Sequence, residues 1–101
     1  MYLGAIRKGP RNHIGDIDGI LVGNAQDEAA RTGVTVVLPG MRAVAGGDVR
    51  GGGPGTRETD LLAPSCLVDA VDAIVLSGGS SWGLEAASGV AAWLGARGRG
   101  Y

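Results

Sequence analysis

The pattern that most suggests chemistry is a serine turn at residues 79–83, which reads Gly-Ser-Ser-Trp-Gly. It matches the nucleophile-elbow pattern G-x-S-x-G, in which a serine stands on a sharp turn between a strand and a helix. The apolar run Ala73–Leu76 before it and the helical spacing after it supply that setting. On this interpretation Ser81 would be the nucleophile of a serine esterase.

Two other interpretations of the same turn stay open. An elbow serine of this kind needs an acid and then a histidine later in the chain, and no histidine follows Ser81. Free backbone N–H groups at Gly79, Ser80 and Ser81 could instead hold a carboxylate or phosphate, although the lysine of a P-loop is absent. The structural alternative is that Ser80 or Ser81 caps the helix.

A glycine loop at residues 50–59 is the second polar feature, since four glycines and a proline exclude regular structure there. Opposite charges surround it, and internal pairing is their expected role: Asp48, Arg50, Arg57, Glu58 and Asp60. Because glycine backbone is costly to order, we expect this loop and the turn at residues 78–82 to lie close together and to border a substrate cavity.

Other candidate groups point to structure. Asp16 and Asp18 would share a strand face, but two carboxylates without a third ligand predict no metal. His13 is expected at the surface or in a turn. Cys66 is the single cysteine, which excludes an internal disulfide and predicts a small buried apolar side chain. No cofactor is predicted.

The elements that would position these residues follow from residue pattern. Strands are expected at residues 14–23 (after a turn), 34–38, 43–49 and 73–76, with a helical turn at 60–63. A helix after the serine turn should bury a stripe at Leu84, Ala87, Ala91 and Leu94, and Gly95 should end it. The fold class is therefore α/β, with residues 1–13 as an arm and residues 14–101 as part of one domain.

Composition narrows the function classes. The chain has 101 residues, 45% apolar and 19% charged, with a net charge of −1, as expected for a folded globular domain. Basic residues are scattered, so neither nucleic acid nor a membrane is an expected partner. The N-terminus has no apolar leader-like run, which favours a cytoplasmic location. One helix covers at most one sheet face, and the chain stops soon after it, which indicates a fragment.

Four blocks, in order, resemble the beginning of the L-aminopeptidase/D-esterase (DmpA-type) family. They are residues 17–23 (Ile-Asp-Gly-Ile-Leu-Val-Gly), 33–39 (Gly-Val-Thr-Val-Val-Leu-Pro), the glycine loop with its continuation at 50–62, and 76–87 around the serine turn. The resemblance covers about four-fifths of the chain and, as it implies, about the first quarter to third of a complete member. Family members often have Phe or Tyr where this chain has Trp82.

The resemblance implies an αββα sandwich of which this chain supplies the N-terminal part. It also implies self-cleavage of a precursor, after which a new N-terminal Ser or Thr attacks, assisted by its own amine. The substrates would be small peptides or amides, and a homo-oligomer is expected. The nucleophile would come from a C-terminal segment, so no catalytic residue is assigned here. Substrate contact is expected from Gly79, Ser80, Ser81 and Trp82. A truncated, non-catalytic interaction module of the same fold is the alternative.

Overall fold

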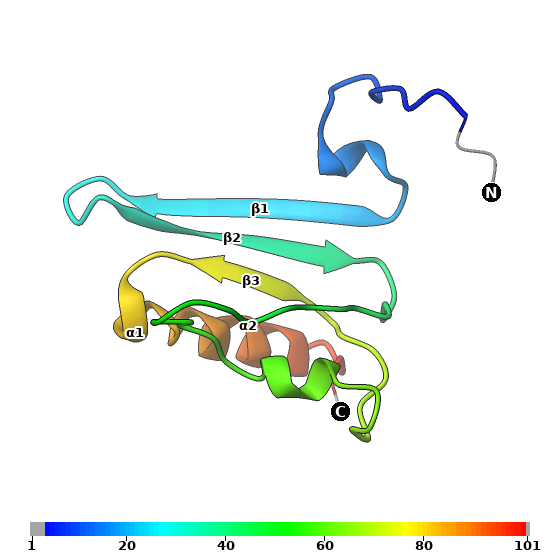
Figure 1. Ribbon diagram of the computed structural model, residues 1–101. Coiled ribbons are helices and arrows are strands. Elements are labelled where there is room, and N and C mark those ends of the chain that lie inside the picture. The colour runs from blue at the N-terminus through cyan, green and yellow to red at the C-terminus, as the bar shows by residue number, and fades with distance from the viewer. Residues whose placement is uncertain (1–3, 101) are drawn as a thin grey trace.

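The computed structural model describes residues 4–100 (Figure 1). A 3-10 turn, η1 (Ile14–Asp16), precedes two long strands, β1 (Ile20–Asp27) and β2 (Thr32–Pro39). A second 3-10 turn, η2 (Thr59–Leu62), comes next, followed by β3 (Ile74–Ser77), α1 (Ser80–Gly83) and α2 (Ala86–Gly95). This mixture of strands and helices is an α/β fold.

The three strands form one antiparallel sheet in the order β1-β2-β3 (Figure 1). Ile20 pairs with Pro39 at one end of the hairpin, and Asp27 pairs with Thr32 beside its turn. Ser77, at the end of β3, pairs with Val34. The predicted strands at 34–38 and 73–76 are confirmed, as is the helical turn that Pro64 limits. The loop predicted at 50–59 is confirmed except at its last residue, Thr59, which begins η2.

The structure corrects two strand predictions. β1 continues past Gly23 to Asp27, because β2 supplies a backbone partner for each polar residue and Thr35 donates a 2.6 Å hydrogen bond to the side chain of Asn24. The segment 43–49 is not a strand, since only Ala43 pairs, in a single bridge to Val71. Two glycines follow, at 46 and 47, and they offer no side chains to hold a ladder together.

The predicted helix consists of two pieces. Leu84 and Glu85 form a turn between α1 and α2, so the helix that carries the serines is only one turn long. Gly79 occupies the N-cap position in a left-handed conformation, and no side chain caps α1. The prediction that Ser80 or Ser81 caps the helix is therefore wrong. Both serines lie within α1, after the residue that would cap it.

The helical layer lies against one face of the sheet. A Cβ added to Gly83 in α1 would lie 3.2 Å from the Ser77 hydroxyl, so α1 packs on the face that carries Ser77. Strand alternation places Val75 on that same face, where it is half-buried. Its neighbours Ile74 and Leu76 point to the other face and are 45% and 60% exposed. Figure 1 shows η1 beside β1 and α2 beside β3.

Few side chains in residues 4–100 are well buried. Within this range the buried residues are Leu94 of α2, which is 7% exposed, and Pro39 at the end of β2. Of the predicted stripe, Leu84 and Ala87 are half-buried and Ala91 is exposed. The radius of gyration is 15.5 Å, against about 13 Å for a compact chain of this length. The chain therefore forms an open layer of sheet and helix.

Cys66 does not occupy the predicted buried position. It is exposed, in the loop after η2, where its thiol donates a 3.3 Å hydrogen bond to the carbonyl of Asp60. Pro64 limits the local helical turn, and the three residues after it, at 65–67, are all exposed. The prediction that Cys66 is buried is wrong, because residue type alone predicts burial, whereas the backbone of this loop places Cys66 at the surface.

Candidate active-site turn

The turn between β3 and α2 has an unusual backbone. Gly79 has φ 91°, and Ser80 follows with φ 58°. Residues other than glycine seldom adopt this left-handed backbone conformation. The Gly83 N–H then donates a 3.0 Å hydrogen bond to the Gly79 carbonyl, which closes the single turn of α1. A strained non-glycine residue of this kind often lies at a functional site.

Two close approaches hold the turn in this conformation. A Cβ on Gly83 would lie 2.7 Å from the carbonyl carbon of Gly78 and closer still to its oxygen. A Cβ on Gly78 would collide with the hydroxyl of Thr32, at the start of β2. The turn is thus pressed between α1 and the hairpin, and both glycines are required by geometry. The Thr32 hydroxyl is enclosed and makes no hydrogen bond to any group within residues 4–100.

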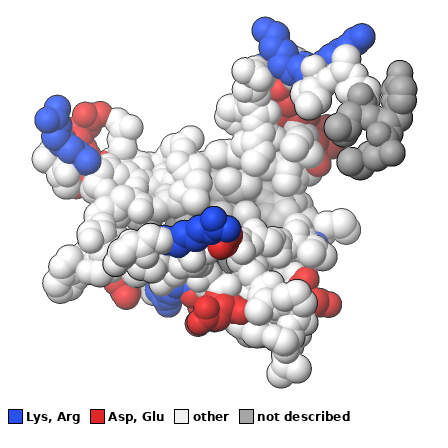
Figure 2. All heavy atoms as spheres, viewed as in Figure 1, with Lys and Arg blue, Asp and Glu red and all other residues white. Residues whose placement is uncertain are grey.

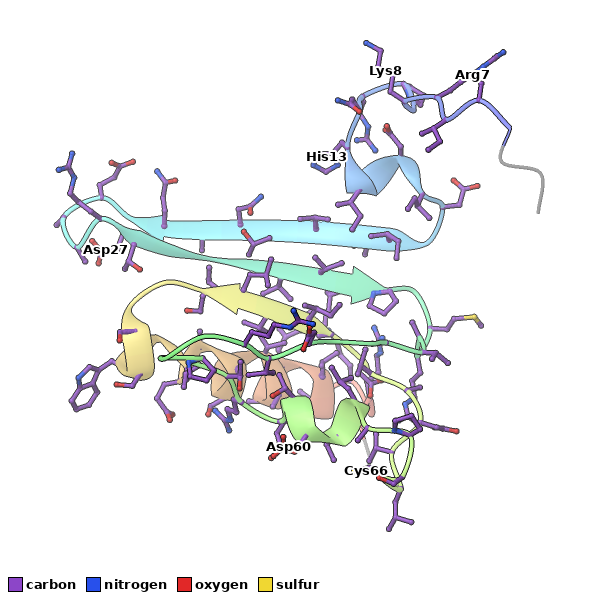
Figure 3. The ribbon with its side chains drawn as sticks, viewed as in Figure 1. Arg7, Lys8, His13, Asp27, Asp60 and Cys66 are labelled. Carbon is purple, nitrogen blue, oxygen red and sulfur yellow. The ribbon has the colours of Figure 1, made fainter. Side chains whose placement is uncertain are left out.

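The predicted substrate-binding residues all lie on the outside of this turn. Gly79, Ser80 and Ser81 are exposed, and the Trp82 side chain is 87% exposed. The strand before Ser81 and the helical turn after it match the setting of an elbow. His13, however, caps η1 near the start of β1, where Ile20 pairs with Pro39, at the opposite end of the sheet from Ser77 (Figure 3). This histidine therefore cannot act as the base for Ser81.

The glycine loop reaches the same region through one arginine. The Arg57 guanidinium donates to the hydroxyl of Ser88 at 2.8 Å and to the carbonyl of Leu84 at 3.4 Å. Ser88 donates in turn to the Glu85 carboxylate at 3.3 Å. The expectation that the loop lies near the turn is met at this point, since Leu84 is two residues after Trp82.

Internal pairing of the loop charges is only partly confirmed. Asp48 and Arg50 form a 2.6 Å ion pair at the surface. Arg57 bonds instead to the segment joining α1 and α2, because the loop folds over that segment. A further ion-pair group lies elsewhere, where Asp72, 10% exposed, pairs with Arg42 at 3.4 Å and with Arg99 at 3.9 Å. Arg99 also donates to the Pro39 carbonyl and so fixes the residues after α2 to the sheet.

An apolar groove lies between η2 and α2, and no residue pattern predicts it. It has a volume of about 620 Å³ and is lined by, among others, Leu61, Leu62, Val68, Val90 and Leu94. The serine turn does not line it. Arg57 and Glu58, at the end of the glycine loop, do line it, so the loop borders this groove and the serine turn does not.

The Asp16 carboxylate is committed to local structure. It accepts hydrogen bonds from the backbone N–H groups of Arg11 and His13 and from the Arg11 side chain at 3.0 Å. Burial works to raise the pKa of Asp16, but these hydrogen bonds outweigh it, and the pKa lies below the ordinary value of 3.8. In residues 4–100, no three His, Cys, Asp or Glu side chains are grouped as metal ligands.

The surface seen in Figure 2 carries charges of both signs in small separate groups, over a largely uncharged background. No helix within the described residues is long and apolar enough to cross a membrane.

The chain is thus an α/β protein with a serine turn between a strand and a helix, and comparison with known proteins identifies its family. The model of peptidase family S58 matches residues 12–100. An uncharacterized aminopeptidase of Mycobacterium tuberculosis is 53% identical over 91 residues, covering 82% of this chain and 26% of the relative. That of Mycobacterium leprae is 52% identical over 93 residues, covering 84% and 26%. The chain belongs to peptidase family S58, and it spans about a quarter of the length of these curated relatives.

Proposed function

We propose that this chain is the N-terminal segment of an aminopeptidase-type amide hydrolase that acts on the N-terminal residues of small peptides, amides or related oligomers. The observation that carries the proposal is the family match across residues 12–100, together with more than half identity to proteins named as aminopeptidases. A match of that extent includes the strands, the glycine loop and the serine turn.

The nucleophile, in this proposal, belongs to a complementary C-terminal segment, which becomes active after the precursor cleaves itself. The position of His13, at the far end of the sheet from Ser81, supports a nucleophile elsewhere. A new N-terminal Ser or Thr would carry its own base, its amine, and would need no histidine. This segment then contributes shape and binding surface.

The uncovered sheet face supports an αββα sandwich. Ile74 and Leu76 of β3 share that face with Val37 of β2 and Val22 of β1, by strand alternation and register. No helix or strand of residues 4–100 forms a layer over that face, and apolar strand residues in such a position normally pack against a second layer. A sheet from the complementary segment would bury them, and the helical layer would remain on the other side. We also propose that the assembled protein is a homo-oligomer.

Within that assembly, the serine turn would border the substrate site. Gly79, Ser80 and Ser81 lie exposed on a turn that is rigid because β3 and α1 fix both of its ends. Rigid placement of exposed groups is what a binding site requires.

The test compares the 101-residue chain with an assembled peptidase, meaning this chain joined to the rest of a peptidase in place of the matching residues of the Mycobacterium tuberculosis relative. We expect the assembled peptidase to cleave itself and to release amino acids from amino-acid amides, and the chain alone to do neither. A sharp cooperative thermal transition of the isolated chain would count against the need for a partner segment. An assembled protein that folds but hydrolyses no amide would refute the function and favour the interaction module.

A further inference from the structure

The serine turn fixes the position of one large exposed side chain, that of Trp82. The first constraint is at the end of β3, where Gly83 packs against the Gly78 carbonyl with no room for a Cβ. The left-handed Ser80 lies between these two glycines. Since Trp82 is the neighbour of Gly83 on this short turn, the direction in which its side chain leaves the backbone is set by these contacts.

The second constraint on the position of Trp82 comes from the glycine loop. Arg57 binds the Leu84 carbonyl and the Ser88 hydroxyl, so one guanidinium joins the end of α1 to the first turns of α2. The Trp82 carbonyl accepts hydrogen bonds from the N–H groups of Leu84 and Glu85, within the same junction. Arg57 therefore holds the junction to which the tryptophan backbone is bonded.

The two tryptophans of the chain differ in what they contact. Trp93 of α2 is 44% exposed, and the Arg97 guanidinium stacks over its ring at 3.6 Å. Trp82 is 87% exposed, and no guanidinium within residues 4–100 stacks on it. An indole offers a large, rigid apolar surface at small entropic cost when something packs on it. Within residues 4–100, the indole of Trp82 is therefore the one that leaves a fixed backbone and has no stacking guanidinium.

We infer that Trp82 is a specificity-determining residue, which favours substrates with a large apolar or aromatic N-terminal side chain, and that Arg57 is its positioning residue. This inference rests on the proposed function and names the substrate class of that site. The substrate side chain packs against the indole. Arg57 does not contact substrate, and it acts by keeping the junction between α1 and α2 in place.

The experiment measures kcat and KM of the assembled peptidase for the amides of phenylalanine, leucine, alanine and glycine. Trp82→Phe should lower the ratio of kcat/KM for phenylalanine amide over alanine amide by roughly tenfold, the size expected when part of an apolar contact is lost. The loss should appear in KM for the large substrates. Arg57→Ala should lower the same ratio, and Arg57→Lys, which keeps one donor group, should restore part of it.

Matched controls come from the other aromatic pair. Trp93→Phe and Arg97→Lys change the same residue types on α2, at sites that the inference does not involve, and should leave the ratio unchanged. Unaltered thermal midpoints would show that each variant is folded. If the wild type is active and Trp82→Phe keeps the ratio, or if Trp93→Phe lowers it equally, this inference is wrong and the proposed function stands. A wild type that hydrolyses none of the amides overturns both.

Discussion

Replacing Gly83 with alanine tests whether the serine turn depends on close backbone packing. The new Cβ would lie 2.7 Å from the Gly78 carbonyl carbon, so α1 must move away from the end of β3. Forced displacement of this kind costs about 1–3 kcal/mol, and loss of the hydrogen bond from Gly83 N–H to Gly79 adds about 1 kcal/mol. Better helix propensity returns about 1 kcal/mol. The net expectation is about 1–3 kcal/mol of destabilisation.

Gly89 provides a matched control within α2. It is also a helical glycine, but nothing lies within 4 Å of an added Cβ. Gly89→Ala should therefore stabilise the protein by about 0.5–1 kcal/mol, through propensity alone. Urea unfolding of the assembled peptidase measures both changes, and the two midpoints should move in opposite directions. Equal stability of Gly83→Ala and the wild type, or equal losses at both sites, would show that the close approach does not constrain the turn.

Two further predictions concern the Asp16 carboxylate at η1 and the buried Leu94 of α2. Because hydrogen bonds hold the Asp16 pKa below 3.8, the order that they give to η1 should be complete above that pH and lost as the pH falls through the lower folded-state pKa. The amide resonances of Arg11 and His13 should therefore move below pH 3.8 in the wild type but not in Asp16→Asn, and identical movement in both would contradict this. Leu94→Ala should destabilise the assembled peptidase by about 2 kcal/mol, the low end for a buried leucine, because the groove beside it is open. A thermal melt measures this, and a change no larger than that of Ala91→Gly, at an exposed position on the same helix, would refute the assignment of Leu94 as the core.

The sequence was sufficient for elements whose signal is local. The run Val34–Leu38 predicts β2 because β-branched residues favour extended backbone, and glycine or proline bounds it on each side. The loop at 50–58 and the limit set by Pro64 follow from backbone chemistry in the same way. These predictions needed no knowledge of what lies nearby.

Sequence predictions are wrong where the outcome depends on residues that are distant along the chain. Alternation at 43–49 suggested a strand, but a strand requires a partner along its length, and Val71 offers one only at Ala43. Ser80 and Ser81 have the residue type of caps, yet the helix begins with Gly79 at its N-cap. The charge pattern predicts that Arg57 pairs with the nearby acids, whereas it bonds to Leu84 and Ser88, which are 27 and 31 residues away.

By itself, the sequence determined the α/β class, the strand-turn-helix around Ser81 and the family resemblance, since each depends on residue type and order along the chain. Only the tertiary structure placed Gly83 against Gly78, left Trp82 exposed and brought Arg57 from the loop to the helix junction. The physical reason is that excluded volume and side-chain hydrogen bonds act between atoms that are close in space. Residue spacing along a chain does not specify those distances until the backbone has folded.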